Sequence, residues 1–352
     1  MKICIIAALY EKDIIGGAEI YVERIVKKLS ENNDIVIITT DKYSRLRSLR
    51  PSKEIKERVT IYRFYPANIY HVSNAAKKPI WIKPIYHLID IWNPYVYFLV
   101  KNILFKEKPD LVHTHNLEGL STSAISAIDS LRIPHIHTVH DYILLNRWNN
   151  MLRGGKIIKK FNFFDRYYMK VMRMISRPIH IILAPSKFIL DIHIKNGYFC
   201  DSTCKKLSLG IELENISKNH KEYDIIRILY VGQISEHKGV HILIKAFEML
   251  KNDNIRLHIV GKNREDNYIK NLVEISKDDE RVIFHGFVHE EFLKELYQKS
   301  NIVVIPSIWY DNSPLVIYES FKSGTPVIGS NIGGISELIR TDRGIFALNT
   351  NK

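Results

Sequence analysis

Cysteine is scarce in this sequence. The chain of 352 residues has three cysteines, Cys4, Cys200 and Cys204. An odd and sparse set argues against a disulfide framework and favours a reducing compartment, so we expect a cytoplasmic protein with free thiols. Three residues separate Cys200 from Cys204, and such a pair without a second pair is a weak signal for a metal site.

Long apolar runs are also missing. The longest candidate, Tyr95 to Phe105, is interrupted by Lys101 and Asn102, and it falls short of the ~18–20 residues that a membrane span needs. The first residues place a lysine before a short apolar run but lack a small-residue cleavage site, so they predict a β-strand rather than a signal peptide. These features indicate a soluble or peripheral protein.

Acidic residues are outnumbered by basic ones. The sequence has 51 Lys plus Arg against 38 Asp plus Glu, and the formal charge of +13 favours polyanions or anionic surfaces as neighbours. The segment from Arg153 to Arg177 contains eight basic residues against the single acid Asp165, and it also carries five aromatic residues. This combination fits an amphipathic helix on anionic lipid headgroups at the cytoplasmic membrane face. It equally fits a helix with an apolar core side and a solvated basic side.

Strands and helices are expected to alternate along the chain. A composition of 46% hydrophobic and 25% charged residues excludes disorder, collagen and coiled coil, and the length predicts two domains. Short β-branched runs alternate with segments of helical spacing, which is typical of a parallel sheet covered on both faces. The expected strands are 2–8, 34–40, 111–114, 133–139, 179–185, 225–231, 256–260, 282–286, 302–306 and 326–329, and the expected helices are 18–29, 125–131, 187–196, 239–250, 267–276, 292–299 and one that contains 319–322.

A polar stretch near Leu213, ELENISKNHKEYD, has no periodicity and predicts a linker. It divides the chain into domains of residues 1–212 and 213–352. Two similar doubly wound α/β domains place a ligand in the crevice at the carboxyl ends of their strands, between the halves. The loops that follow strands are therefore the places to look for chemistry.

Two glycine-containing loops stand between an expected strand and an expected helix. Gly16 and Gly17 let backbone N–H groups approach a phosphate at a helix N-terminus, although a plain tight turn fits as well. In VGQISEHKGV, Lys238 precedes Gly239 and is suited to place an ammonium beside a pyrophosphate. A solvated loop lysine is the alternative.

The segment SIWYDNSPLVIYES follows an apolar strand. Asp311 and Glu319 lie eight residues apart, and Ser313 with Pro314 are signals for a helix start. Two carboxylates in this arrangement can bind the hydroxyls of a sugar and of a ribose. The alternative is an N-cap residue and a surface acid on the helix.

His140 and Asp141 follow an expected strand in the first half of the chain and so also face the crevice. His140 ends an alternating series with His135 and His137, and two further histidines come shortly before, a spacing that resembles a metal site. His135 and His137 point the same way along a strand, and no second carboxylate motif completes a hydrolase site. Hydrogen-bonded strand histidines with one functional histidine, His140, are therefore favoured over a metal centre.

In combination these segments are specific enough to indicate one protein family. The order GGAE, then HD, then VGQISEHKG, then WYDNSPLVIYES with GTPVIGSNIGGISE resembles the group 1 (family four) retaining glycosyltransferases. The resemblance spans nearly the whole chain, from Gly16 to Glu337. It implies the GT-B fold, in which two Rossmann-like domains face each other across a cleft. It also implies a UDP- or GDP-linked sugar donor on the C-terminal domain, a glycan or lipid-linked acceptor on the N-terminal domain, and no cofactor.

The resemblance also implies roles for individual residues. Lys238 would stabilise the leaving diphosphate, and Glu319, the second acid of the family's E-x7-E motif, would hold the ribose. Asp311 stands in the first acid's place near the donor sugar, and His140 would contact the hydroxyls of the reacting sugar. Further donor contacts would come from Gly16 and Gly17 over the phosphates and sugar, from Gly286 to Val288 at the base, and from the backbone of Asn312, Ser313, Pro314 and Leu315.

Three departures from the family pattern stand out. Gln233 occupies a position where the family often has Arg; because Gln brings no charge, we expect a weaker clamp on the leaving phosphate or help from His237. Asp311 replaces Glu with a side chain one methylene shorter, which we expect to alter sugar preference. Family members usually continue for several helices after the GGISE segment, whereas this sequence ends at Lys352. Either the sequence is truncated, with its C-terminal helices missing, or the two domains close on each other in a different way.

The implied mechanism is retaining. No D-x-D motif occurs, so the phosphates would be handled by backbone groups and Lys238 without a metal. No nucleophilic carboxylate is evident at the expected site, which favours front-face attack assisted by the leaving phosphate.

A nucleotide-sugar epimerase or sugar phosphorylase on the same fold is the alternative enzyme class, and WYDNSPLVIYES fits it less well. A nucleic-acid binder is the non-enzymatic alternative, but no nucleic acid is expected as a partner because a recognised motif is lacking.

Overall fold

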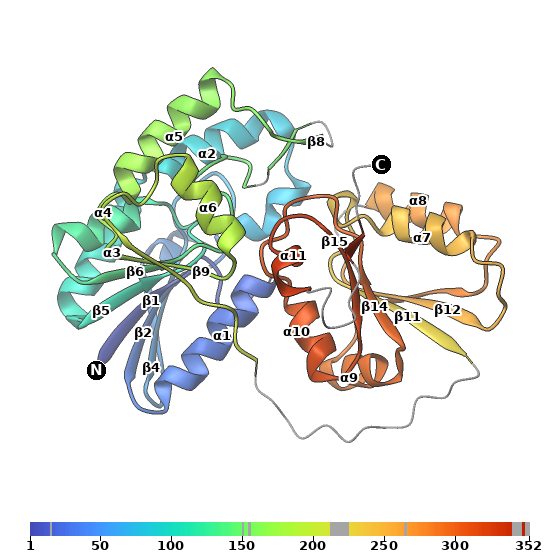
Figure 1. Ribbon diagram of the computed structural model, residues 1–352. Helices are drawn as coiled ribbons and strands as arrows, with labels where there is room; N and C mark the ends of the chain where they lie inside the picture. The colour runs from blue at the N-terminus through green and yellow to red at the C-terminus, as the bar shows by residue number, and fades with distance from the viewer. Residues whose placement is uncertain are drawn as a thin grey trace. The chain divides into compact units, whose positions relative to one another are not determined.

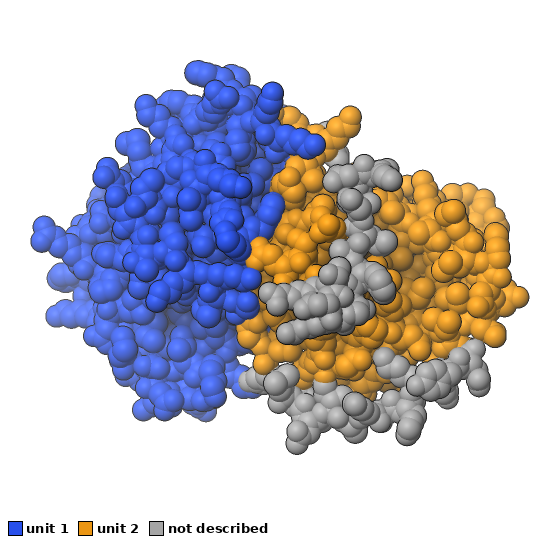
Figure 2. Space-filling model, in the orientation of Figure 1, with its two compact units in different colours: residues 1–151, 158–208 blue, residues 152–157, 209–352 orange. Residues whose placement is uncertain are grey.

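The structure is a computed structural model that describes residues 1–14, 16–149, 151–153, 156–211, 225–263, 266–339 and 347–348. The chain forms two compact units, shown in blue and orange in Figure 2. Unit 1 comprises Met1–Met151 and Ile158–Ser208, and unit 2 comprises Leu152–Ile157 and Leu209–Lys352. This division falls four residues before the predicted boundary at 212/213. The predicted linker coincides with residues 212–224, which lie outside the described residues.

Unit 1 contains an eight-stranded sheet in the order β10-β9-β6-β5-β1-β2-β4-β3 (Figure 1). All pairings are parallel except that of β3 with β4. The strands are β1 (Lys2–Ile6), β2 (Asp34–Thr40), β3 (Ser52–Lys56), β4 (Val59–Phe64), β5 (Leu111–Thr114), β6 (His135–Thr138), β9 (Ile181–Ala184) and β10 (Thr203–Lys206).

The helices of unit 1 connect these strands. They are α1 (Gly17–Ser30), α2 (Lys83–Ile91), α3 (Pro94–Glu107), α4 (Ser123–Ser130), α5 (Phe163–Ser176) and α6 (Lys187–Lys195), with 3₁₀ turns η1 (Leu46–Leu49), η2 (Val72–Lys77) and η3 (Ile80–Ile82). Val22 and Val26 of α1 pack with Ile3, Ile5 and Ile37 of β1 and β2. The intervening strand residues, such as Cys4 and Ile38, are fully buried too, so the middle of the sheet is covered on both faces.

Unit 2 contains a six-stranded parallel sheet in the order β13-β12-β11-β14-β15-β16. The strands are β11 (Ile226–Val231), β12 (Ile255–Val260), β13 (Val282–Gly286), β14 (Ile302–Ile305), β15 (Val327–Ser330) and β16 (Ala347–Leu348). The helices are α7 (Val240–Glu248), α8 (Asp266–Ile275), α9 (Glu290–Lys299), α10 (Leu315–Lys322) and α11 (Ile335–Leu338), with the 3₁₀ turn η4 (Glu236–Lys238). A hairpin of β7 (Leu152–Arg153) and β8 (Lys156–Ile157) also belongs to this unit.

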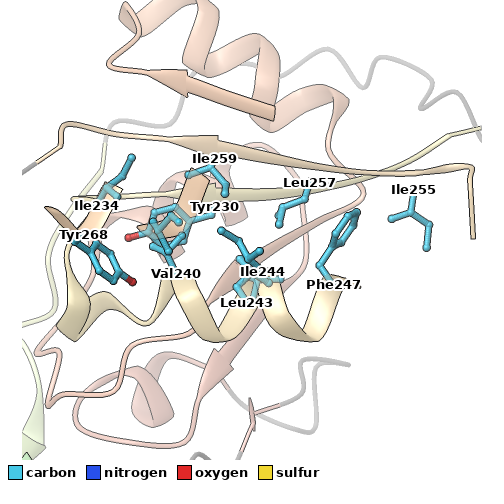
Figure 3. Close-up of a cluster of buried hydrophobic side chains, with 12 residues drawn as sticks. Tyr230, Ile234, Val240, Leu243, Ile244, Phe247, Ile255, Leu257, Ile259 and Tyr268 are labelled. Atoms are coloured by element: carbon cyan, nitrogen blue, oxygen red, sulfur yellow. The ribbon is translucent and has the colours of Figure 1, made fainter. Parts of the chain in front are cut away.

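Two apolar clusters hold unit 2 together. One lies between α7 and the sheet, where Leu243, Ile244 and Phe247 meet Leu257 and Ile259 of β12 (Figure 3). The other joins β14, α9, α10 and α11. The prediction of two α/β units with parallel sheets is therefore confirmed, and each unit has its own core.

Candidate active site

The loops after β11 and β14 bring Lys238 and Asp311 together. These two strands are neighbours in the parallel sheet of unit 2, so the loops at their carboxyl ends emerge at the same edge. The Lys238 ammonium lies 2.6 Å from Asp311 Oδ2, and the Ser307 hydroxyl donates to the same oxygen at 3.0 Å. The ammonium also lies 5.4 Å from the centre of the Trp309 ring. Two predicted site residues thus form one ion pair.

The pair is largely shielded from solvent. The Lys238 and Asp311 side chains are 19% and 12% exposed, so each charge depends on the other for solvation. Lysine has three N–H donors, and the hydrogen bond to Asp311 uses one of them. The site therefore holds a positive group in place that retains capacity to donate to an anion.

Two glycines allow the backbone to close around this pair. Gly239 has φ +73°, and a Cβ there would lie 2.1 Å from the Pro306 carbonyl oxygen. Gly333 has φ +60°, and its Cβ would lie 2.6 Å from the Asp311 carbonyl oxygen. Larger residues at either position would push the loops apart, because both the φ value and the space favour glycine.

Glu319 is half-buried on α10 rather than a free surface acid. The Tyr297 hydroxyl donates to Glu319 Oε2 at 3.2 Å. Burial, followed by the Glu319 charge, raises the pKa of Tyr297 well above its usual value, so the phenol stays protonated and keeps donating. This contact fixes the carboxylate on the helix.

The segment before α10 is ordered as the sequence predicts. The helix begins at Leu315, directly after Pro314, and the Ser313 and Tyr318 hydroxyls are 3.0 Å apart. Asn312 is buried beside Asp311. The predicted helix start is confirmed.

The predicted contacts to the base lie after β13. Gly286 has φ +67°, and its carbonyl accepts from Gly261 N–H at 2.8 Å, while Val288 packs on the apolar cluster of β14. The same predicted range includes Phe287, whose exposed ring lies 4.6 Å from the Lys262 ammonium, measured to the ring centre. After β11, the Gln233 carbonyl accepts from the Tyr230 hydroxyl at 2.7 Å.

Gly16 and Gly17 stand at the start of α1, in the loop after β1. Gly16 is the N-cap residue with an extended backbone, and its N–H donates to Glu19 Oε2 at 2.7 Å; Gly17 is the first residue of the helix. Glu19 Oε1 also accepts from the Asn116 side chain at 3.3 Å. The predicted glycine turn before a helix is present.

His140 is held among other aromatic rings in unit 1. Its Nε2 lies 3.0 Å from His115 Nδ1, and the Tyr21 ring meets it edge-on at 5.3 Å between centroids. Burial, and secondarily His113, lowers the pKa of His140 to about 3, so the imidazole is neutral near pH 7. A neutral imidazole is suited to hydrogen bonds with hydroxyls.

The strand histidines are hydrogen-bonded to threonines. His113 pairs with Thr138 at 2.8 Å, and the Thr114 hydroxyl lies 2.8 Å from both His135 and His137. Among the residues that the structure describes, no group of three or more His, Cys, Asp or Glu side chains is arranged to hold a metal ion.

Two carboxyl groups near His140 were not given a role in the predicted site, although Asp141 was expected to face the crevice. Asp141 accepts from Ile143 N–H at 3.1 Å, and Glu118 accepts from the Asn149 side chain at 2.7 Å. Burial raises the pKa of Asp141 to about 6 and that of Glu118 to about 7, with Asp141 adding to the latter. The position of Glu118 a few residues after β5 was the signal that could have found it.

Comparisons with known proteins decide the family. Residues 15–214 match the family model described as glycosyltransferase family 4, and residues 212–351 match that of glycosyl transferases group 1. The chain belongs to the group 1, family 4 glycosyltransferases. This glycosyltransferase transfers a sugar from a nucleotide sugar, and it has the GT-B fold. The predicted family is confirmed.

Some of its relatives are distant but match nearly the whole chain. A protein from the cps region of Klebsiella pneumoniae is 25% identical over 348 residues, which cover 99% of this chain and 90% of that protein. Sucrose-phosphate synthase from Thermosynechococcus elongatus matches with a TM-score of 0.74 at 18% identity, covering 100% of this chain and 86% of that one. HepE from Anabaena, in complex with UDP and glucose, matches with a TM-score of 0.69 at 18% identity and the same coverage.

The described part of this glycosyltransferase contains no helix that is both long enough and apolar enough to cross a membrane.

Proposed function

We propose that this glycosyltransferase is a retaining enzyme that moves a hexose from a UDP- or GDP-sugar to a glycan or lipid-linked acceptor in the synthesis of cell-surface polysaccharide or glycoconjugate. In this proposal residues 213–352 bind the donor and residues 1–212 bind the acceptor. The relative from a Klebsiella pneumoniae cps region and the UDP and glucose bound to HepE support it.

The pairing of Lys238 with Asp311 is the observation that carries the proposal. The barrier to transfer is departure of a nucleotide diphosphate from an oxocarbenium-like carbon, so a fixed positive group beside the phosphates contributes most. Lys238 supplies that charge, and Gln233 supplies a neutral donor at the place where the family often has Arg. Glu319 holds the ribose through its carboxylate.

The remaining donor contacts come from backbone and from one histidine. Gly16 and Gly17 approach the phosphates and sugar, and Gly286 to Val288 hold the base. The backbone from Asn312 through Ser313 and Pro314 to Leu315 contacts sugar or phosphate. His140, as a neutral imidazole, contacts hydroxyls of the reacting sugar.

Retention proceeds by front-face attack assisted by the leaving phosphate. Asp311 is a poor candidate for a covalent nucleophile, because its Oδ2 already accepts from an ammonium and a hydroxyl. A trapped covalent glycosyl-enzyme would overturn this mechanism.

A donor panel tests the proposal. The chain is mixed with UDP-, GDP- and other nucleotide sugars, and thermal stabilisation and nucleotide release are measured for the unchanged protein, Lys238→Ala and the control Lys245→Ala, which alters an exposed lysine on α7. We expect one donor to stabilise the protein and release its nucleotide, with both responses lost in Lys238→Ala alone. A panel without any response contradicts the proposal.

We further propose that the basic segment from Arg153 to Arg177 faces an anionic membrane. A pocket of about 420 Å³ there is lined by Lys159, Lys160, Phe161, Arg166, Met169, Arg173 and Asn196. The Arg173 guanidinium donates to the Asn196 carbonyl at 2.9 Å, which fixes one cation at the wall. Replacing Lys159, Lys160 and Arg166 with Gln should weaken binding to anionic vesicles, and unchanged binding would reject this role for the pocket.

A further inference from the structure

The segment of η3 and α2 exposes its apolar side. Trp81, Ile85, Leu88 and Trp92 recur at intervals of four, three and four residues, which places them on one face of the helical segment. They are 73%, 50%, 69% and 45% exposed, and the adjoining Ile80 is 78% exposed. A contiguous exposed patch of this kind marks an interaction surface.

The opposite face of α2 buries polar groups. The Asp90 carboxylate accepts from Gly119 N–H at 3.1 and 3.0 Å. Tyr86 stacks on Tyr70 with ring centres 4.2 Å apart, and His87 meets Trp148 edge-on at 5.1 Å. Rolling the helix to bury its apolar residues would break these contacts, so the exposed side is a fixed feature of the fold.

The apolar side continues onto α3. Trp92 stacks on Tyr97 at 5.7 Å between ring centres, and Tyr97 meets Phe98 edge-on at 5.1 Å. Phe98 is itself exposed. We define the α2 surface as Ile80, Trp81, Ile85, Leu88, Trp92 and Phe98.

Lysines outnumber acids in the sequence that carries this surface. Lys77, Lys78, Lys83 and Lys101 flank the apolar residues in the sequence, and from Val72 to Lys106 the single acid is the buried Asp90. Lys101 lies over the Tyr97 ring at 5.6 Å from its centre. These flanking lysines, called the lysine rim below, give this part of the chain a net positive charge.

We propose that the α2 surface docks onto an anionic lipid bilayer, with its tryptophans and aliphatic side chains in the interfacial layer and the flanking lysines on the lipid phosphates. Tryptophan favours this depth, and lysine-flanked apolar helices bind anionic membranes in the plane of the interface. This extends the proposed membrane association from the α5 segment to a second element and is independent of the donor chemistry.

Charge argues for a bilayer rather than a second copy of the chain. A two-fold dimer formed by the α2 surface would bring its lysine rim against the same rim of the other copy. Like charges face each other in such a contact, whereas anionic headgroups neutralise the lysines. The bilayer satisfies both the apolar side chains and the charges.

Vesicle flotation tests the proposal. The intact chain is mixed with vesicles of phosphatidylcholine containing about one third phosphatidylglycerol, and with phosphatidylcholine alone. We expect binding to the anionic vesicles, reduced at least about tenfold in the double variant Trp81→Gln, Leu88→Gln. The control Leu46→Gln, Met249→Gln alters two equally exposed apolar residues elsewhere and should bind like the unchanged chain.

Two further readouts separate the possible outcomes. The emission of Trp81 and Trp92 should shift to the blue on vesicle binding, because the rings leave water. Donor-induced thermal stabilisation, measured without vesicles, should be the same in the double variant, so loss of docking is distinguished from loss of the proposed enzyme function. Unchanged flotation of the double variant overturns the proposal. So does concentration-dependent dimerisation of the unchanged chain that the double variant loses while neither binds vesicles.

Discussion

The charge states of the side chains at the carboxyl ends of the strands differ between the two units. In unit 1, burial lowers the pKa of His140 to about 3, which keeps this imidazole neutral, and raises the pKa of Glu118 to about 7, which leaves this carboxyl partly protonated near neutral pH. In unit 2, an ammonium and a carboxylate pair at 2.6 Å. Neutral donors and acceptors suit the hydroxyls of sugars, whereas a fixed cation suits a diphosphate. The difference is consistent with the proposed roles, in which unit 1 contacts hydroxyls of the reacting sugar and unit 2 contacts the diphosphate.

The largest effect is expected from removing the cation. Lys238→Met should lower kcat/KM by about 10²–10³-fold, because a preorganised charge at the leaving group stabilises the transition state. Lys245→Met, on the adjacent helix α7, is the matched control. The measurement is initial-rate kinetics with the donor found in the panel. A loss of tenfold or less would mean that the backbone and Gln233 carry most of the leaving-group stabilisation, and the contrast between the units would weaken.

The next effect concerns how the loop holds the cation in place. Gly239→Ala should destabilise unit 2 by about 2–4 kcal/mol, since the added methyl group meets the Pro306 carbonyl and the φ value is unfavourable. Gly324→Ala is the control, because Gly324 has φ +64° but open space around its Cβ, so it should cost about 1 kcal/mol. Urea unfolding of both variants measures the difference. Equal costs would show that the loop moves freely away from Pro306.

The fold could be predicted where the apolar pattern in the sequence agrees with the way the element packs in the structure. Residues 34–40, 111–114 and 282–286 were predicted to the residue as strands, because each is a short, mostly apolar run. The first two are largely buried, whereas 282–286 is a half-buried strand at the edge of its sheet. The helices α2 and α3 were missed. In α2 the polar residues Tyr86, His87 and Asp90 lie inside and the apolar ones outside, which reverses the pattern that identifies a helix.

The candidate site was predictable as motifs but not as contacts. The sequence singled out Lys238 and Asp311 separately, yet 73 residues separate them. Their pairing depends on β11 lying beside β14, a neighbour relation that does not follow from chain order. Glu118 was missed, and Asp141 was expected at the crevice without a role, because their raised pKa values depend on burial, which a sequence pattern does not report.

A change in pH is expected to have a smaller effect, on the free energy of unfolding. Burial lowers the pKa of His113 and His193 to about 4 and that of His135 and His140 to about 3. Below about pH 6.5 the unfolded chain binds protons at these histidines and the folded chain does not. The contribution of the neutral histidines to the free energy of unfolding is therefore complete above about pH 6.5 and is lost as the pH falls toward about 4.

The buried acids act in the opposite direction. The raised pKa values of Asp141 and Glu118 make the folded chain bind protons that the unfolded chain has lost, so their contribution grows as the pH falls from about 7 toward 4. The histidines outnumber these acids, and stability should fall on acidification. His135→Gln should reduce the slope by up to about 1 kcal/mol per pH unit. Urea unfolding between pH 4.5 and 7.5 measures it, and an unchanged slope would contradict a neutral His135.

The smallest effect is expected from Asp311→Glu. The longer side chain keeps the charge, so Lys238 and Ser307 retain an acceptor, but the carboxylate moves by one methylene relative to the sugar. We expect the ranking of donor sugars to change by a few-fold in kcat/KM, about 1 kcal/mol of discrimination, while the overall rate with the best donor stays within about tenfold. Kinetics with two or more sugars on the same nucleotide measure the ranking, and Glu295→Asp on the exposed side of α9 controls for acid length. An identical ranking would mean that Asp311 acts through Lys238 alone. In that case the Asp311 carboxylate would help unit 2 to bind the diphosphate but would not discriminate between sugars.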